Sequence, residues 1–307
     1  MSRAREAGYR LLGSRLDYLL HLRPVEWPIM AAHTAVGYLL AVGLSGAARG
    51  ERLGPALLGL GLWVGCLNGG TLALNSAFDR DEGDIAYLRN PPLPPRRLAA
   101  FALALMASGQ VAALALPPLY QATYAVCFVL SVLYSVPPIR LKAVAGADWL
   151  INMVGFGTLT PLAGWAATGR PLEKTEAIVL VAFCPLFAAL YPLTQLYQLE
   201  EDARRGDRTL ASIIGARRSL DVALAAAVVA FGLFAWAGLL RSAWATPVAG
   251  DWRWGALLVA LVGWLSVLVP WRARADRLSP SDHQRRMYHA LAAWAVTDLV
   301  VVLTWGT

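Results

Sequence analysis

The sequence predicts an all-α membrane protein with nine transmembrane helices, and three observations support this fold class. The 307-residue chain is 57% hydrophobic and only 15% charged, with a mean hydropathy of +0.51, which is far from the composition of a soluble domain. Its apolar residues fall into long stretches, each near the roughly 20 residues that cross a bilayer as a helix. Its basic residues are concentrated in alternate loops, as membrane topology requires.

Nine spans can be placed in chain order between the more polar loops. Only the tripeptide "LPP" at 116–118 separates the third span from the fourth, so the apolar stretches alone leave an eight-span alternative open. The predicted spans are 27–47, 54–78, 98–115, 119–136, 148–168, 176–198, 220–240, 254–271 and 287–305.

The basic residues favour nine spans over eight. The N-terminus and every second loop, near 79–97, 137–147, 199–219 and 272–286, hold 21 of the 27 Lys and Arg residues, and the other loops hold 6. A wrong number of spans would mix these two sets. The positive-inside rule then predicts that the N-terminus and the long charged loops face the cytoplasm, at a bacterial-type inner membrane. Basic residues so dispersed argue against a nucleic-acid surface, despite the net charge of +7.

The segment 1–26 is Arg-rich and amphipathic, and no small-residue cleavage site precedes the first apolar stretch. We expect it to form a helix on the membrane surface that leads into the first span. The three cysteines lie singly in apolar stretches, without the spacing of a metal site or a disulfide framework, so we expect them to pack in the core. They are Cys66, Cys127 and Cys184.

Two acidic stretches mark the ends of the second and sixth spans. Residues 75–84 read "NSAFDRDEGD" and residues 198–207 read "QLEEDARRGD". Aligned without gaps at a constant offset of 123 residues, they match a carboxamide, an Asp, a Gly and a second Asp. The second and sixth helices run in the same direction, so the match predicts a parallel internal repeat within a single domain, 1–307.

The residue types in these stretches predict a magnesium site. Positions four apart lie on one face of a helix, so Asn75 pairs with Asp79, and Gln198 pairs with Asp202. The glycines that follow would let the chain turn Asp84 and Asp207 back towards the same centre. Carboxylate and carboxamide oxygens without His or Cys nearby suit Mg²⁺, which commonly bridges carboxylates to phosphates. The alternative is a solvated helix end whose acids pair with local arginines.

A phosphate ligand also needs cations, and the loop after the fourth span offers two. Arg140 and Lys142 follow the rigid Pro137–Pro138 pair in "YSVPPIRLK". Arg80 lies within the first acidic stretch, and Arg208 directly follows the second. Arg89, Arg96 and Arg97 frame the Pro-rich segment 91–95, where positive-inside topology explains them equally well.

Four motifs occur in the order seen in the UbiA-type intramembrane prenyltransferases, and the chain resembles that family from Leu22 to the last span. The motifs are "LRPVEW" at 22–27, "NSAFDRDEGD…RNPPLPP" from 75, "YSVPPIRLK" from 134 and "DARRGDRTL" at 202–210. The resemblance implies nine helices around a central cavity that cytoplasmic loops cap. It also implies Mg²⁺ as cofactor, an isoprenyl diphosphate as substrate and a lipophilic, often aromatic, acceptor.

Residue by residue, the resemblance assigns Asn75, Asp79 and Asp202 to matching positions of the two acidic signatures. Tyr134 and Lys142 match a Tyr and a basic residue of the loop after the fourth helix. The implied catalytic set is Asp79, Asp202, Tyr134, Arg140 and Lys142. The chain departs from the family pattern at three positions: Ser76 replaces an Asp, Gly83 stands where the last Asp is usual, and Gln198 replaces an Asp.

These departures leave several functions open. An acceptor could attack the allylic cation that forms when the diphosphate leaves, which is prenyl transfer. The double bonds of the isoprenyl chain could attack instead, which makes a membrane terpene cyclase. In both cases we expect Tyr134, Tyr191 and Tyr197 to line the cation's site. A cation transporter is a third alternative, although the second and sixth spans carry no acid at mid-membrane depth; an inactive scaffold is a fourth.

Overall fold

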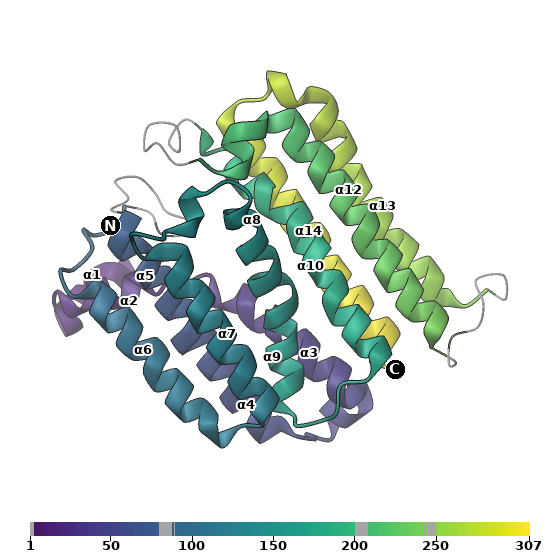
Figure 1. Cartoon of the computed structure of the whole chain (residues 1–307), viewed down its shortest axis with the longest axis horizontal. Coiled ribbons are helices and arrows are strands. Elements are labelled where there is room, and N and C mark those ends of the chain that lie inside the picture. The colour runs from purple at the N-terminus through teal and green to yellow at the C-terminus, as the bar shows by residue number, and fades with distance from the viewer. Residues whose placement is uncertain (1–2, 80–87, 89, 200–207, 242–243, 245–249) are drawn as a thin grey trace.

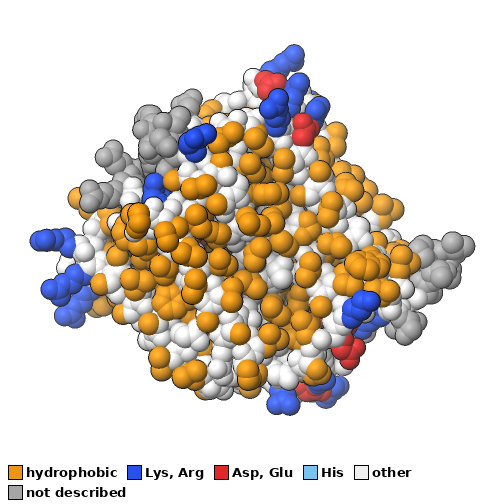
Figure 2. All heavy atoms as spheres, in the orientation of Figure 1, with side chains coloured by type: hydrophobic (Ala, Val, Ile, Leu, Met, Phe, Trp, Pro, Cys, Tyr) orange, Lys and Arg blue, Asp and Glu red, His pale blue; other side chains and the backbone are white. Residues whose placement is uncertain are grey.

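The computed structural model describes residues 3–79, 88, 90–199, 208–241, 244 and 250–307. Nine of the described helical segments are long and apolar enough to cross a membrane, which confirms the predicted fold class. Two short helices, α1 (Arg3–Leu12) and α2 (Arg15–His21), precede the first of them. Figure 2 shows hydrophobic side chains across most of the visible face, with Lys, Arg, Asp and Glu gathered at its margins, as a bilayer requires.

The spans follow one another along the chain, and Figure 1 shows the second to fourth on one side of the bundle and the last four on the other. The first span is α3 (Trp27–Ala48), and the second runs through α4 (Leu53–Gly61), a π-helical turn (Leu62–Asn68) and α5 (Gly69–Asp79). The third is α6 (Leu98–Ala112), extended to Ala115, and the fourth is α7 (Pro118–Ser135). The fifth joins α8 (Ala147–Asn152), a second π-helical turn (Met153–Leu159) and α9 (Thr160–Ala167). The last four are α10 (Lys174–Gln195), α12 (Leu210–Leu240), α13 (Trp252–Arg274), extended to Arg277, and α14 (Pro280–Trp305).

Several predicted span ends differ from the observed ones, and caps rather than hydropathy decide where the seventh and ninth helices begin. The seventh begins at Leu210, where the Thr209 hydroxyl accepts a hydrogen bond from the Ser212 amide. The ninth begins at Pro280, where Ser279 and Asp282 form a capping box. The sixth ends at Gln195, three residues before the predicted end.

Two groups of buried side chains hold the bundle together, one in each half. Large aromatic residues fill both, including Phe183, Phe234 and Trp264 in one half and Trp63 and Tyr124 in the other. The apolar area that they bury, together with close packing, stabilises a helical bundle. The first and fifth spans contribute to both groups and so join the halves.

The α3–α9 contact is close because glycines face backbone on both helices. A Cβ atom added at Gly37 would lie 1.7 Å from the carbonyl oxygen of Pro161. One added at Gly164 would lie 1.8 Å from the carbonyl oxygen of Thr34. Small residues let membrane helices approach in this way. The contact fixes the position of α3 along the axis of the fifth span.

A fully buried acid, Asp148, ties three elements together at one end of the bundle. Its carboxylate accepts hydrogen bonds from the Gly146 amide (2.9 Å), the Gln195 side-chain amide (2.7 Å) and the Leu210 amide (3.3 Å). The side-chain oxygen of Gln195 accepts in turn from the Ala211 amide, at 3.1 Å. The start of α8, the end of α10 and the start of α12 are thereby fixed on both sides of the second acidic stretch.

Substituting either interface glycine with alanine is expected to destabilise the bundle. Gly37→Ala and Gly164→Ala insert a methyl group against a carbonyl oxygen, and such overpacking costs about 1–3 kcal/mol. Gly232→Ala is the matched control, since nothing lies within 4 Å of its added Cβ. Thermal unfolding of the detergent-purified variants measures the effect. Unfolding temperatures for the interface variants equal to that of Gly232→Ala would contradict the close contact.

Removing the buried acid is expected to cost more than removing a surface one. Asp148→Ala leaves the Gln195 and Leu210 donors without their partner, at about 1–3 kcal/mol for each such group. Asp276→Ala is the control, because its ion pair with Arg217 (3.4 Å) joins two mostly exposed side chains, and such pairs contribute about 0–1 kcal/mol. The same thermal assay compares the two variants. Equal decreases in unfolding temperature would contradict the proposed role of Asp148 in joining the three helix ends.

Candidate active site

A cavity of about 360 Å³ opens inside the bundle between its two halves. Most of its wall is apolar, with Trp63, Leu67, Phe156, Phe187 and Leu190 among the lining residues. Both π-helical turns contribute to this wall, through Leu67 and Phe156 respectively. A π-helical turn inside an α-helix is frequent at functional sites, because the extra residue changes which side chains face inward.

At the end of α5, next to the cavity-lining Asn75, two predicted ligands meet two predicted cations. The Lys142 ammonium contacts the Asp79 carboxylate and donates to the Asn75 side-chain oxygen at 3.2 Å. A guanidinium nitrogen of Arg140 lies 3.3 Å from the same Asp79 oxygen. Asp79 is nearly buried, with 4% of its side chain exposed. A carboxylate so buried is stabilised by these two charges.

The loop between α7 and α8 places these cations. Val136 is extended, a cis peptide joins Pro137 and Pro138, and Arg140 adopts the left-handed conformation with φ of 34°. A short 3-10 turn, Leu141–Ala143, follows. Left-handed backbone at an arginine is uncommon and is retained where the surroundings hold it. Here it directs Arg140 and Lys142 to the same carboxylate.

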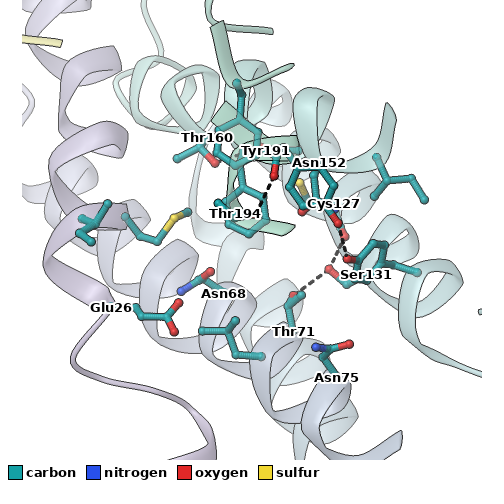
Figure 3. A pocket seen from close by; sticks show the side chains of 18 of the residues that line it. Glu26, Asn68, Thr71, Asn75, Cys127, Ser131, Asn152, Thr160, Tyr191 and Thr194 are labelled. Atoms are coloured by element: carbon teal, nitrogen blue, oxygen red, sulfur yellow. Dashed lines mark hydrogen bonds between the residues drawn. The ribbon is translucent and has the colours of Figure 1, made fainter. Parts of the chain in front are cut away.

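Tyrosines occupy the wall beyond this charged end. Tyr134, Tyr191 and Tyr197 all line the cavity. The hydroxyl groups of Tyr134 and Tyr191 lie 3.0 Å apart and share a hydrogen bond. The Thr194 hydroxyl donates to the backbone carbonyl of Tyr191 at 2.6 Å, as the dashed line in Figure 3 marks. Electron-rich rings at this place can stabilise a positive charge in the cavity.

The second acidic stretch is only partly described. Gln198 lies in a turn after α10, where its backbone amide donates to the Gln195 carbonyl at 3.0 Å. The prediction that Gln198 lies on the sixth helix is therefore wrong, because that helix ends at Gln195. Arg208 is exposed, just before the cap of α12. The remaining predicted site residues lie outside the described part of the chain: Arg80, Asp84, Asp202 and Asp207.

Several polar cavity residues escaped the motif-based prediction. Asn68, Thr71 and Asn75 line the cavity in succession along the second span. Thr71 shares a 2.7 Å hydrogen bond with Ser131, which Figure 3 shows as a dashed line. Reading back from Asn75 in steps of three and four residues would have found Thr71 and Asn68, since such steps stay on one helical face. No comparable signal exists for Ser131.

Arg23 and Glu26, before and at the start of α3, also line the cavity. The two side chains form an ion pair at 3.6 Å, and Arg23 donates to the Ser76 hydroxyl at 3.3 Å. Burial raises the pKa of the Glu26 carboxyl above its ordinary value, and the nearby Arg23 guanidinium opposes this shift. Glu26 and Asn68 both line the cavity and are labelled in Figure 3.

The ligand atoms at the end of α5 are of the type that magnesium prefers. Asp79 and Asn75 offer hard oxygen atoms from one helical face, as Mg²⁺ prefers. Among the described residues, no three His, Cys, Asp or Glu side chains form a group that could hold a metal. A complete site in this chain would need the acids of 80–84 and 200–207, which lie outside that part.

Comparisons of this sequence with known proteins all point to the same family. The sequence profile described as the UbiA prenyltransferase family matches residues 32–294. A digeranylgeranylglyceryl phosphate synthase of Natronomonas pharaonis is 32% identical over 251 residues, which are 76% of this chain and 85% of that protein. A protoheme IX farnesyltransferase of Thermofilum pendens is 26% identical over 61% of this chain and 67% of its own length.

A solved structure agrees with these sequence matches at the level of fold. A UbiA homologue from Archaeoglobus fulgidus, bound to GPP and Mg²⁺, superposes with a TM-score of 0.64 at 20% identity. The match covers 94% of this chain and 99% of that one. The bundle, its cavity and the profile match over most of the sequence together show that the chain belongs to the UbiA prenyltransferase family.

Proposed function

We propose that this prenyltransferase uses Mg²⁺ to bind an isoprenyl diphosphate and transfers the prenyl group to a lipophilic or aromatic acceptor inside the membrane. The observation that carries the proposal is a largely apolar cavity whose lining residue Asn75 also belongs to a cluster with Asp79 and Lys142. A prenyl diphosphate has the same division into an apolar chain and a charged head. The names of two relatives support a prenyl donor, since both are prenyl-transferring enzymes.

In this proposal the diphosphate binds at the end of α5. Arg140 and Lys142 now pair with Asp79, and the same cations would lie against phosphate oxygens once a donor is bound. Arg80 and Arg208 are further candidates for this role. When bound, Mg²⁺ supplies positive charge that neutralises the leaving diphosphate. Asn75, Asp79, Asp84, Gln198, Asp202 and Asp207 remain the proposed ligands.

The chemical step is the loss of diphosphate from the allylic carbon. Negative charge grows on the leaving group, so cations fixed before the reaction lower the barrier. Positive charge grows on the prenyl group, next to Tyr134, Tyr191 and Tyr197, whose rings stabilise it by cation–π contact. The apolar wall excludes water that would otherwise capture the cation. The acceptor then forms the new bond.

The distribution of basic residues supports a cytoplasmic position for the charged end of the cavity. The loop that carries Arg140 and Lys142 belongs to the set of segments with 21 of the 27 Lys and Arg residues. The positive-inside rule places that set in the cytoplasm, where prenyl diphosphates would reach Asp79 without crossing the bilayer.

Neutralising Asp79 is expected to abolish the activity. Asp79→Asn keeps the size of the side chain but removes its charge, and pyrophosphate release with acceptor should fall at least about a hundredfold, as when a group that stabilises transition-state charge is lost. Geranyl, farnesyl and geranylgeranyl diphosphates serve as donors for purified protein in detergent with Mg²⁺. Chelation by EDTA should abolish donor binding in the wild type.

The matched control is Asp276→Asn, an exposed acid in the turn after α13. It should keep the wild-type rate. Wild-type activity in Asp79→Asn, or donor binding unaffected by EDTA, would count against the proposal. A cyclic hydrocarbon formed without any acceptor would identify a cyclase instead.

A further inference from the structure

An aspartic acid, Asp298, lies well inside the predicted last span, 287–305, where an acid is unfavourable unless it has partners. Its carboxyl group faces the His33 ring, whose Nδ1 lies 3.1 Å from one oxygen and 3.2 Å from the other. The Trp294 ring nitrogen donates to the same group at 3.1 Å. These three residues form the His33 cluster. The proposed chemistry at the diphosphate uses none of them, so the cluster is expected to have a role of its own.

The other ring nitrogen of His33 contacts the second π-helical turn. Nε2 lies 3.3 Å from the backbone oxygen of Gly157. In a regular α-helix this oxygen would accept from the amide of residue 161, which is a proline and has no N–H. Within a membrane, a side chain from a neighbouring helix can supply the missing donor. His33, which is only 4% exposed, supplies it from α3.

These partners decide where the protons of the cluster lie. The Gly157 oxygen can only accept, so Nε2 of His33 carries a hydrogen. Nδ1 and the Asp298 carboxyl group face each other, and a hydrogen bond between them requires one further proton. An amide side chain at position 298 would satisfy the same partners, because it donates through its nitrogen and accepts from Trp294 through its oxygen.

The His33 cluster lies behind an aromatic part of the cavity wall. Phe156 directly precedes Gly157, lines the cavity and stacks on Phe187, with ring centroids 5.3 Å apart. Phe187 also lines the cavity and packs edge-on against Trp294, at 5.5 Å. The cluster is thus linked to both stacked rings, to Phe156 through the backbone of its neighbour and to Phe187 through Trp294.

The stacked rings lie at a distance from the proposed diphosphate site. Phe187 lies eight residues before Gln195, the last residue of α10, which is about 12 Å along the helix. The end of α10 is tied through Asp148 to the start of α8, just after the loop that carries Lys142. A prenyl chain whose diphosphate is bound at this end would meet the stacked rings with its distal part, not with its reacting carbon.

We propose that the His33 cluster positions the Phe156–Phe187 pair and thereby decides which length of prenyl chain the cavity accepts. This inference rests on the proposed function and deepens it, because it names residues that select among donors of the same chemistry. The three members of the cluster are positioning residues, since none of them lines the cavity. Rings held in one place leave a gap beside a chain that is too short and collide with one that is too long. Rings without these hydrogen bonds adapt to either.

Donor binding to the purified protein tests this selection. Calorimetric titrations in one detergent with Mg²⁺ use geranyl, farnesyl and geranylgeranyl diphosphates, and inorganic pyrophosphate as a probe of the charged site alone. The wild type should bind its best donor at least about tenfold more tightly than its worst, since one methylene in a fitted pocket is worth about 10–200-fold. His33→Leu should lose most of this discrimination and keep the wild-type affinity for pyrophosphate. Equal affinities for the three donors in the wild type would overturn the inference.

A matched control separates positioning from a general loss of stability. His283 is a second buried histidine whose ring accepts a hydrogen bond from an indole, that of Trp271, at 2.9 Å. It does not line the cavity. His283→Leu should lower the unfolding temperature, as His33→Leu should, but it should keep the wild-type discrimination among donors. The same loss of discrimination in both variants would speak against a specific role of the His33 cluster.

Conservative variants test the hydrogen bonds themselves. Asp298→Asn still donates to Nδ1 of His33 and accepts from Trp294, so it should keep the discrimination. Asp298→Leu cannot do either and should lose it, which also provides a second test if His33→Leu does not fold. Equal loss in Asp298→Asn and Asp298→Leu would contradict the hydrogen-bonded link between the cluster and the wall.

Failure of the proposed function would look different. If neither the prenyl diphosphates nor pyrophosphate bind in a Mg²⁺-dependent way, the proposed function fails, and this inference fails with it. Mg²⁺-dependent binding with the same discrimination in the wild type, His33→Leu and Asp298→Leu would overturn the inference alone.

Discussion

The interior of a bilayer offers no hydrogen-bond partner, and the rest of this structure depends on that constraint. Every backbone amide at membrane depth has to bond within the protein, so the described spans are helical apart from breaks at Gly43 and Gly215. After the first break, the Leu44 amide donates to the Gly306 carbonyl at 2.7 Å. Charged side chains are confined to helix ends or paired within the bundle. Asp79 with Lys142 is an example of the second solution. The buried end of Asp298 is hydrogen-bonded to the His33 ring at 3.1 Å and to the Trp294 ring nitrogen at 3.1 Å. Polar groups that remain in the interior then have to serve a ligand or each other.

This constraint explains why the polar cavity residues of the second span share one face. The face of the second span that carries Asn68, Thr71 and Asn75 ends at Asp79, beside the cations of the loop after α7. Ions that are paired and shielded from water cost less than isolated ones, and cations that can leave one anion for another are suited to binding a charged substrate. Asp148 and Gln195 provide a comparable paired arrangement for the other acidic stretch, with backbone amides as partners.

Much of the fold followed from the sequence because hydropathy and loop charge are local signals. The third span was placed at 98–115, as observed. Helix ends that are set by caps are harder to predict from hydropathy. The cap residues Ser279 and Asp282, for example, lie in a polar segment that a hydropathy criterion leaves out of the span. Within the site, Asn75, Asp79, Arg140 and Lys142 could be named from motifs. Glu26 and Asn68 could not, because their place at the cavity depends on two segments meeting in space.

The two π-helical turns have a consequence for how such a cavity can change. Each holds one residue more than an α-helix needs over the same rise. The helical face that is turned to the cavity is therefore rotated between the segment before the turn and the segment after it. Loss of one residue from Leu62–Asn68 would restore regular winding and rotate the segment before it by about 100° against α5. Trp63 would leave the wall while Asp79 kept its place. The depth of the cavity and the chemistry at its mouth can thus vary separately among related chains, through single insertions or deletions.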